Sequence, residues 1–310
     1  MTYQTKALAT DTNSRAELND LYGDLIHETI NLNRNFWNAL RKVPNSSDRA
    51  GYRVRTAANS TADSYDELDT ITTGNSTRQR HYFPIKQVKV GVEVSGLMME
   101  SAKGAGGVGD IWAEEIRAAS EDLAVELDKQ VLGSAAVTST DISGLDYLIA
   151  ATGAYSDVAD RTATGYAWSI GVVNTTAEDL STTRMRTMIS TVLDAGAKED
   201  SLLFVTNNTQ VRKFKDLMQD VQRTVPTSSK VGFTGQPEFD GIPVLADPNV
   251  TSGEMFLLDM STIELRVLKD VSIQPLPEAK DARAAFISIY AALICTNPSV
   301  NYKKTALTVT

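Results

Sequence analysis

The chain has 310 residues, of which 42% are hydrophobic and 22% charged, a balance typical of a folded protein and not of a disordered one. Its formal net charge of -9 argues against sequence-independent nucleic-acid binding through a generally basic surface, although a local basic patch remains compatible with it. A single cysteine, Cys295, excludes an intrachain disulfide, and together with two histidines it cannot supply a Cys/His zinc cluster.

The hydropathy pattern predicts neither a membrane span nor a standard secretion signal. The longest apolar run, at 284–296, is shorter than the roughly 20 residues that a membrane-spanning helix needs. The first residues lack a basic start followed by an apolar core.

Residues 14–43 carry apolar side chains at spacings of three, four or seven, which predicts an amphipathic helix. Ser14 and Glu17 have the spacing of a capping box at its start. Pro44 and the polar run 45–47 end it, because the residue before a proline avoids the helical conformation. We therefore expect an N-terminal helix with one apolar face.

Residues 49–96 lack a helical period and instead contain two extended arms, 52–61 and 78–95, around a polar, turn-rich middle at 63–77. At about 3.3 Å per residue, such arms project a hairpin of roughly 35 Å or more. An isolated two-stranded ribbon is marginally stable in water. We therefore expect this hairpin to lie on another surface.

The glycine run at 104–109 satisfies the pattern G-x-G-x-x-G. In a dinucleotide-binding fold an apolar strand leads directly into the first glycine, and an acidic residue ends a second strand about 20 positions later. Here residues 100–103 intervene, and position 124 falls inside a predicted helix. We interpret the glycines as a hinge, and a nucleotide-binding oxidoreductase stays as the less favoured alternative. The hinge residues are Gly104, Gly106, Gly107 and Gly109.

After this run, Asp110 can cap a helix that reaches Leu132 and is followed by Gly133. At about 1.5 Å per residue this helix is a rod of roughly 35 Å. One stripe of the rod is apolar, from Trp112 to Val131, and the opposite face is acidic. The acids assigned to that face are Asp110, Glu114, Glu115, Glu121, Asp122, Glu126 and Asp128.

The second half of the chain predicts a mixture of short helices and strands. Residues 134–174 resemble loops with short strands, and Thr176 and Asp179 open a helix that ends near Leu193. A buried strand at 202–205, a helix at 209–221 and a loop at 222–236 follow. Further strands are predicted at 241–246, 255–259, 264–273 and 284–295. Helices and strands occur in blocks, which indicates an α+β fold.

No motif in the chain demands catalysis. There is no P-loop and no G-x-S-x-G, and His27-Glu28 lacks the second histidine of H-E-x-x-H. The carboxylates are too numerous and too dispersed to select an acid–base pair. We therefore predict no catalytic residue, no cofactor-binding residue and no metal ligand.

In this order of elements the chain resembles the major capsid proteins of tailed double-stranded DNA viruses, which have the Hong Kong 97-type fold. The similarity is sharpest late in the chain. It lies in the segments 238–244 with Asp247-Pro248, 255–259, 263–268 and 285–288.

The resemblance implies an N-arm at 1–48 and an extended E-loop hairpin at 49–96. It implies a peripheral domain with a long spine helix, made of 97–140 and parts of 238–310. The axial domain would then contain 141–237 and parts of 238–300.

The resemblance also implies a non-enzymatic role. The chain would be a structural subunit of an icosahedral capsid that assembles in the host cytoplasm, forms pentamers and hexamers, and encloses double-stranded DNA without sequence-specific binding. A separate scaffolding protein, a portal and decoration proteins are the implied partners. An encapsulin-type nanocompartment shell, which resembles the same fold, stays as the alternative.

Charge along the predicted hairpin suggests what it contacts. Arginines and lysines fall on the arms, and positions 49–62 and 70–92 contain no acid, whereas the acids at 63, 66, 67 and 69 gather near the tip. We predict that the arms of one subunit lie across the acidic spine helix of its neighbour; the alternative is that both are solvated faces. The predicted contact residues are Arg53, Arg55, Arg78, Arg80, Glu114, Glu121 and Glu126.

Overall fold

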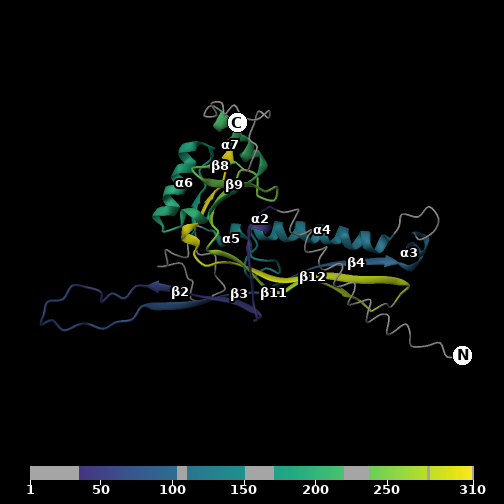
Figure 1. Cartoon of the computed structure of the whole chain (residues 1–310), viewed down its shortest axis with the longest axis horizontal. Coiled ribbons are helices and arrows are strands. Elements are labelled where there is room, and N and C mark those ends of the chain that lie inside the picture. The colour runs from purple at the N-terminus through teal and green to yellow at the C-terminus, as the bar shows by residue number, and fades with distance from the viewer. Residues whose placement is uncertain (1–34, 103–109, 151–170, 220–236, 278–279, 309–310) are drawn as a thin grey trace.

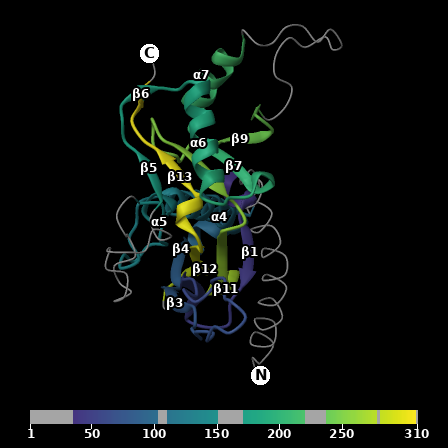
Figure 2. The same ribbon diagram turned by 90° about the vertical axis from the view of Figure 1, so that its left-hand side faces the viewer.

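The computed structural model describes residues 35–102, 110–150, 171–219, 237–277 and 280–308. Two sheets make up the body, and Figure 2 shows them one above the other. The four-stranded sheet has the order β1 (Arg41–Pro44), β11 (Ile263–Pro275), β12 (Ala282–Cys295) and β4 (Lys86–Ser95). The six-stranded sheet has the order β5 (Val172–Asn174), β13 (Tyr302–Lys304), β10 (Met255–Asp259), β7 (Leu202–Thr206), β9 (Ile242–Ala246) and β8 (Glu238–Phe239).

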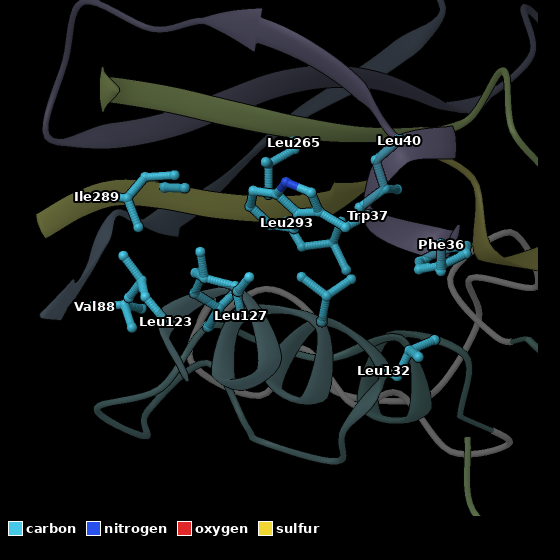
Figure 3. Close-up of a cluster of buried hydrophobic side chains, with 14 of the residues drawn as sticks. Phe36, Trp37, Leu40, Val88, Leu123, Leu127, Leu132, Leu265, Ile289 and Leu293 are labelled. Carbon is cyan, nitrogen blue, oxygen red and sulfur yellow. The ribbon is translucent and has the colours of Figure 1, made fainter. Parts of the chain in front are cut away.

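Helix α4 (Ile111–Leu132) runs along the four-stranded sheet and packs on β4 and β12 (Figure 1). It begins as predicted, because the Asp110 side chain accepts hydrogen bonds from the backbone N–H groups of Trp112 and Ala113. Its apolar stripe, including Leu123 and Leu127, is buried against Val88, Ile289 and Leu293 of the sheet (Figure 3). This layer forms the larger hydrophobic core.

The six-stranded sheet is buried on both faces, which explains why its central strands are continuously apolar. In β10, Phe256 and Leu258 belong to the larger core, whereas Met255 and Leu257 belong to a second core. Helices α6 (Thr182–Asp194) and α7 (Asn208–Gln219) cover that second face. The two cores therefore share a sheet.

Short elements complete the described chain. They are α2 (Asn35–Ala39), α3 (Gly96–Ala102), α5 (Leu145–Leu148), the 3-10 turns η2 (Glu199–Ser201) and η3 (Pro298–Val300), and the small parallel pair β6 (Glu178–Asp179) and β14 (Leu307–Thr308). Lys303 of β13 is buried and contacts the carboxylates of Asp146 in α5 and Glu254. Burial lowers the pKa of Lys303, and the two carboxylates compensate its charge.

A separate antiparallel ribbon projects from the body, formed by β2 (Arg49–Ala57) and β3 (Thr77–Pro84) (Figure 1). The prediction that 78–95 forms one arm of the hairpin is wrong, because the segment consists of two strands that are separated at Ile85. β3 stays in the ribbon, whereas β4 joins the four-stranded sheet beside β12. The alternating valines of β4 face α4 and need that apolar partner, which a projecting ribbon cannot give.

The predicted N-terminal helix is wrong at its C-terminal end, and residues 14–34 lie outside the described ranges. Helix α2 ends at Ala39, and Arg41–Pro44 forms β1 in parallel register with β11. Pro44 disfavours helix in the residue before it, and the edge of β11 offers hydrogen bonds to an extended chain.

Two local expectations are also corrected. Helix α6 starts at Thr182 with Ser181 as its cap, because Glu178 and Asp179 are already paired with β14. Asp128, assigned to the acidic face of α4, is buried. It follows Ala124 by four positions and precedes Val131 by three, so it shares their side of the helix.

Candidate inter-subunit surface

The β2–β3 ribbon has two chemically different faces, because successive residues of a strand alternate between faces. Ala50, Tyr52 and Phe83 lie on the face toward the body. Ala50 and Phe83 are buried, and the Tyr52 hydroxyl donates to the backbone oxygen of Cys295 at 3.1 Å. This inward face fixes the base of the ribbon on the four-stranded sheet.

The outward face of the ribbon is basic. In the antiparallel register Arg53 lies opposite Arg80, and Arg55 lies opposite Arg78. All four side chains are exposed, and none of their guanidinium groups pairs with a carboxylate among the described residues. We call this set, with Arg49 at the base of β2, the arginine face. Like charges directly opposite each other on two strands destabilise the pairing.

A shallow pocket of about 210 Å³ lies within the arginine face, lined by Gly51, Tyr52, Arg53, Arg80 and Tyr82. Gly51 makes room for it: a Cβ at this position would lie 2.9 Å from Cδ1 of the Tyr82 ring. The Tyr82 side chain covers the glycine and stays 40% exposed. The pocket therefore offers two guanidinium groups and an aromatic ring to a molecule outside the chain.

The tip of the ribbon differs from its base in charge. Its acids, Asp63, Asp66, Glu67 and Asp69, are exposed. Two apolar side chains at the tip are also exposed, Leu68 at 96% and Ile71 at 69%. Exposed apolar groups of this size at the end of a projecting ribbon are typical of a contact surface.

Apart from the cap Asp110 and the buried Asp128, the predicted acids of α4 fall into two classes. Glu114 is exposed and has no partner among the described residues, and the same holds for Glu115 and Asp122. Glu121 pairs with Arg117 at 3.5 Å, and Glu126 accepts a hydrogen bond from Gln130 at 2.8 Å. Both are half-buried. Only the first class is free to meet a new cation.

Within one copy, the structure does not bring the predicted contact residues together. Figure 1 shows the ribbon pointing away from α4, at the opposite end of the molecule from α3. The predicted hinge residues Gly104, Gly106, Gly107 and Gly109 lie outside the described residues. In the described ranges, no group of three or more His, Cys, Asp or Glu side chains is placed to hold a metal ion. No described helix is long and apolar enough to cross a membrane.

Comparison with known proteins gives a consistent result. The family model described as SU10 major capsid protein matches residues 1–308. A search of curated proteins found no match.

Solved structures give the fold. The capsid asymmetric unit of cyanophage A-1(L) is similar with a TM-score of 0.71 and 16% identity, over 87% of this chain and 91% of that chain. The capsid of a native GTA particle is similar with a TM-score of 0.68 and 13% identity, over 90% of this chain and 91% of that chain. The holo-SrpI encapsulin complex from Synechococcus elongatus is similar with a TM-score of 0.60 and 13% identity, over 89% of this chain and 88% of that chain. These similarities confirm the mixed helix and strand fold of the Hong Kong 97 type.

Proposed function

Because the chain belongs to the SU10 major capsid protein family, it is a structural, non-enzymatic subunit of a viral capsid, and we propose that its copies form pentamers and hexamers that close an icosahedral shell around double-stranded DNA. The oxidoreductase interpretation of the glycine run is thereby discarded. The observation that carries the proposal is the arginine face, which the described part of its own chain leaves unneutralised. A ribbon of this kind is expected to be stable only against a partner.

The arginine face lies on α4 of a neighbouring copy. Glu114, Glu115 and Asp122 are the acids that receive it, because they are exposed and unpaired. Glu121 and Glu126 contribute less, since each would first lose a contact within its own helix. Single exposed pairs contribute only about 0 to 1 kcal/mol, but the contact recurs at every subunit of a closed shell and rejects wrongly charged surfaces.

The elements suggest a division of the subunit. Residues 1–48 form the N-arm, and the ribbon of β2 and β3 forms the E-loop, which ends at Pro84 and not at residue 96. Strands β4, β11 and β12 form the peripheral domain with α4 as its spine helix, and β1 of the N-arm pairs with the edge of β11. The six-stranded sheet with α6 and α7 forms the axial domain. The predicted glycine hinge lies outside the described residues, between α3 and α4 in the sequence.

Other partners follow from the same account. Assembly takes place in the host cytoplasm with a separate scaffolding protein, and a portal and decoration proteins complete the particle. An overall charge of -9 repels phosphate, so that DNA packs inside without adhering to the shell.

Two experiments test the proposal. Negative-stain microscopy of the purified chain, with and without a candidate scaffolding protein, should show closed shells or pentameric and hexameric capsomers; a monomer, dimer or tetramer under all conditions contradicts it. The similarity to the SrpI encapsulin makes a nanocompartment shell the second candidate. Extraction of particles from infected or expressing cells separates the two, because a capsid yields a genome and a nanocompartment yields a protein cargo.

A further inference from the structure

Two carboxyl groups from distant parts of the sequence meet inside the larger core. Asp128 lies in α4 and Asp247 follows β9, and both side chains are fully buried. The side-chain amide of Asn249 donates to Oδ2 of Asp128 at 2.6 Å, and the backbone N–H of Asn249 donates to Oδ1 of Asp247 at 2.9 Å. The loop at 247–249 is thereby tied to α4.

The same carboxyl pair holds α2. The backbone N–H of Phe36 donates to Oδ2 of Asp247 at 3.4 Å. The side chains of Phe36 and Trp37 are buried, and Figure 3 shows them between the sheet and the part of α4 that carries Leu127 and Leu132. Three segments therefore converge here: the start of the described chain, the long helix, and the loop after β9.

Hydrogen bonds from the protein do not satisfy this pair completely. Oδ1 of Asp128 has no donor among the described residues, and Asp128 lies within hydrogen-bonding reach of the Asp247 side chain. Two carboxylates in contact inside a core cannot both carry a charge without a large cost, whereas one proton between them removes a charge and supplies the missing hydrogen bond.

Among the described residues, no cation forms an ion pair with Asp128. Asp247 is the charged group that acts on it, and helix α2 has no charged residue. From β1, Lys42 approaches α2, and its ammonium group lies 5.1 Å from the centroid of the Trp37 ring. From α5, Asp146 is engaged with Lys303. On β12, the Arg283 guanidinium lies over the Trp112 ring. The charged residues of β4 have other partners or are exposed. Lys86 donates to the backbone oxygen of Ser139, and the Lys89 ammonium group lies over the Phe286 ring. Glu93 faces solvent.

Burial, followed by repulsion from Asp247, raises the pKa of Asp128 to about 7, although hydrogen bonds from the Asn249 side chain and from the Trp37 backbone of α2 oppose the shift. With α2 released and water admitted, the carboxyl would return toward its ordinary value near 4. The closed junction therefore binds one proton more than the open junction between these two values. Opening becomes easier as pH rises through that window and levels off above it.

We propose that the Asp128–Asp247 pair shares one proton in the folded subunit, and that loss of this proton releases α2 from α4 and the loop at 247–249. The pair is thus a pH-sensitive latch for α2, which lies within the proposed N-arm. The latch belongs to the single subunit and does not depend on how copies assemble.

Amide hydrogen exchange of the full chain tests the latch, with mass spectrometry on a peptide covering residues 35–40 and protection factors measured from about pH 5 to pH 8. In the wild-type protein the protection factor should fall by about tenfold per pH unit up to about pH 7 and then level off. A peptide covering β10 should keep its protection, which separates local release from global unfolding.

The variant Asp128→Asn carries an amide that can donate to Asp247 as the shared proton does, so its protection factor should stay constant with pH. Asp122→Asn, an exposed site on the same helix, is the matched control and should follow the wild type. If Asp128→Asn does not fold, the reciprocal Asp247→Asn should level off at a lower pH than the wild type, because burial still raises the pKa of Asp128 whereas the repulsion from Asp247 is gone. A constant profile in the wild type, an equally steep fall in Asp128→Asn, or an unchanged profile in Asp247→Asn overturns the latch.

Discussion

Arg53 and Arg80 lie directly opposite each other in the ribbon of β2 and β3, on the face that points away from the body. Arg55 and Arg78 repeat the arrangement. A folded subunit gains nothing from two adjacent pairs of like charge on a projecting ribbon, since each pair weakens strand pairing. Their arrangement is understandable when the ribbon works in an assembly, where acids of another copy neutralise it.

Reversal of charge on the arginine face should block assembly without unfolding the subunit. Arg53→Glu with Arg55→Glu should leave a soluble, folded chain that forms no shells at low salt, where screening is weakest. Arg212→Glu, an exposed site on α7, should assemble normally. Adding Glu114→Lys and Glu115→Lys to the double reversal should restore part of the assembly, more than Glu121→Lys and Glu126→Lys do. Light scattering and microscopy measure the outcome, and normal assembly of the double reversal would refute the contact.

Gly51 should be needed for the shape of the arginine face. A larger side chain here must displace the Tyr82 ring, so Gly51→Val should increase proteolytic cleavage within 49–84 and weaken assembly. The free energy of unfolding of the body should change by less than about 1 kcal/mol, because the outward face has no part in the core. Gly91→Val is the control, since a Cβ at Gly91 meets no atom within 4 Å. Equal cleavage of the two variants would show that the Tyr82–Gly51 contact does not matter.

The α4 layer should supply much of the stability. Leu123 is fully buried, so Leu123→Ala should lower the free energy of unfolding by about 2 to 5 kcal/mol in denaturant titrations. Leu97 of α3 is 80% exposed, and Leu97→Ala should change it by less than about 0.5 kcal/mol. A small loss at Leu123 would mean that α4 does not pack on the sheet as described.

Shells should be held together without covalent links between subunits. The ribbon tip at 58–77 contains no lysine that could form an amide cross-link to another subunit. Cys295 is buried in β12 beside the Asn301 side chain, so its thiol is not accessible for a disulfide between subunits. Denaturing, non-reducing gels of intact particles should therefore show one band at the monomer mass. A ladder of covalent multimers would contradict this.

The sequence predicted best what is decided locally. Helix α4 has its cap, its apolar stripe and its following glycine within one window, and its bounds agree with the structure. The sequence predicts the β1 segment as the end of a helix and β4 as part of the hairpin, because their strand partners, β11 and β12, lie far along the chain. The cross-strand arginine pairs depend on a register that the two arms alone do not specify. Asp128 was predicted to be a surface acid because Asp247, which lies beside it in the fold, is 119 residues away in the sequence.

A cryo-electron microscopy reconstruction of assembled particles tests the central claim most directly, because it shows what the arginine face touches. The account predicts that the guanidinium groups of Arg53 and Arg80 lie within ion-pair distance of Glu114, Glu115 or Asp122 on α4 of a neighbouring copy. A shell in which the arginine face points into solvent or contacts packaged DNA, with those acids unpaired, would contradict it.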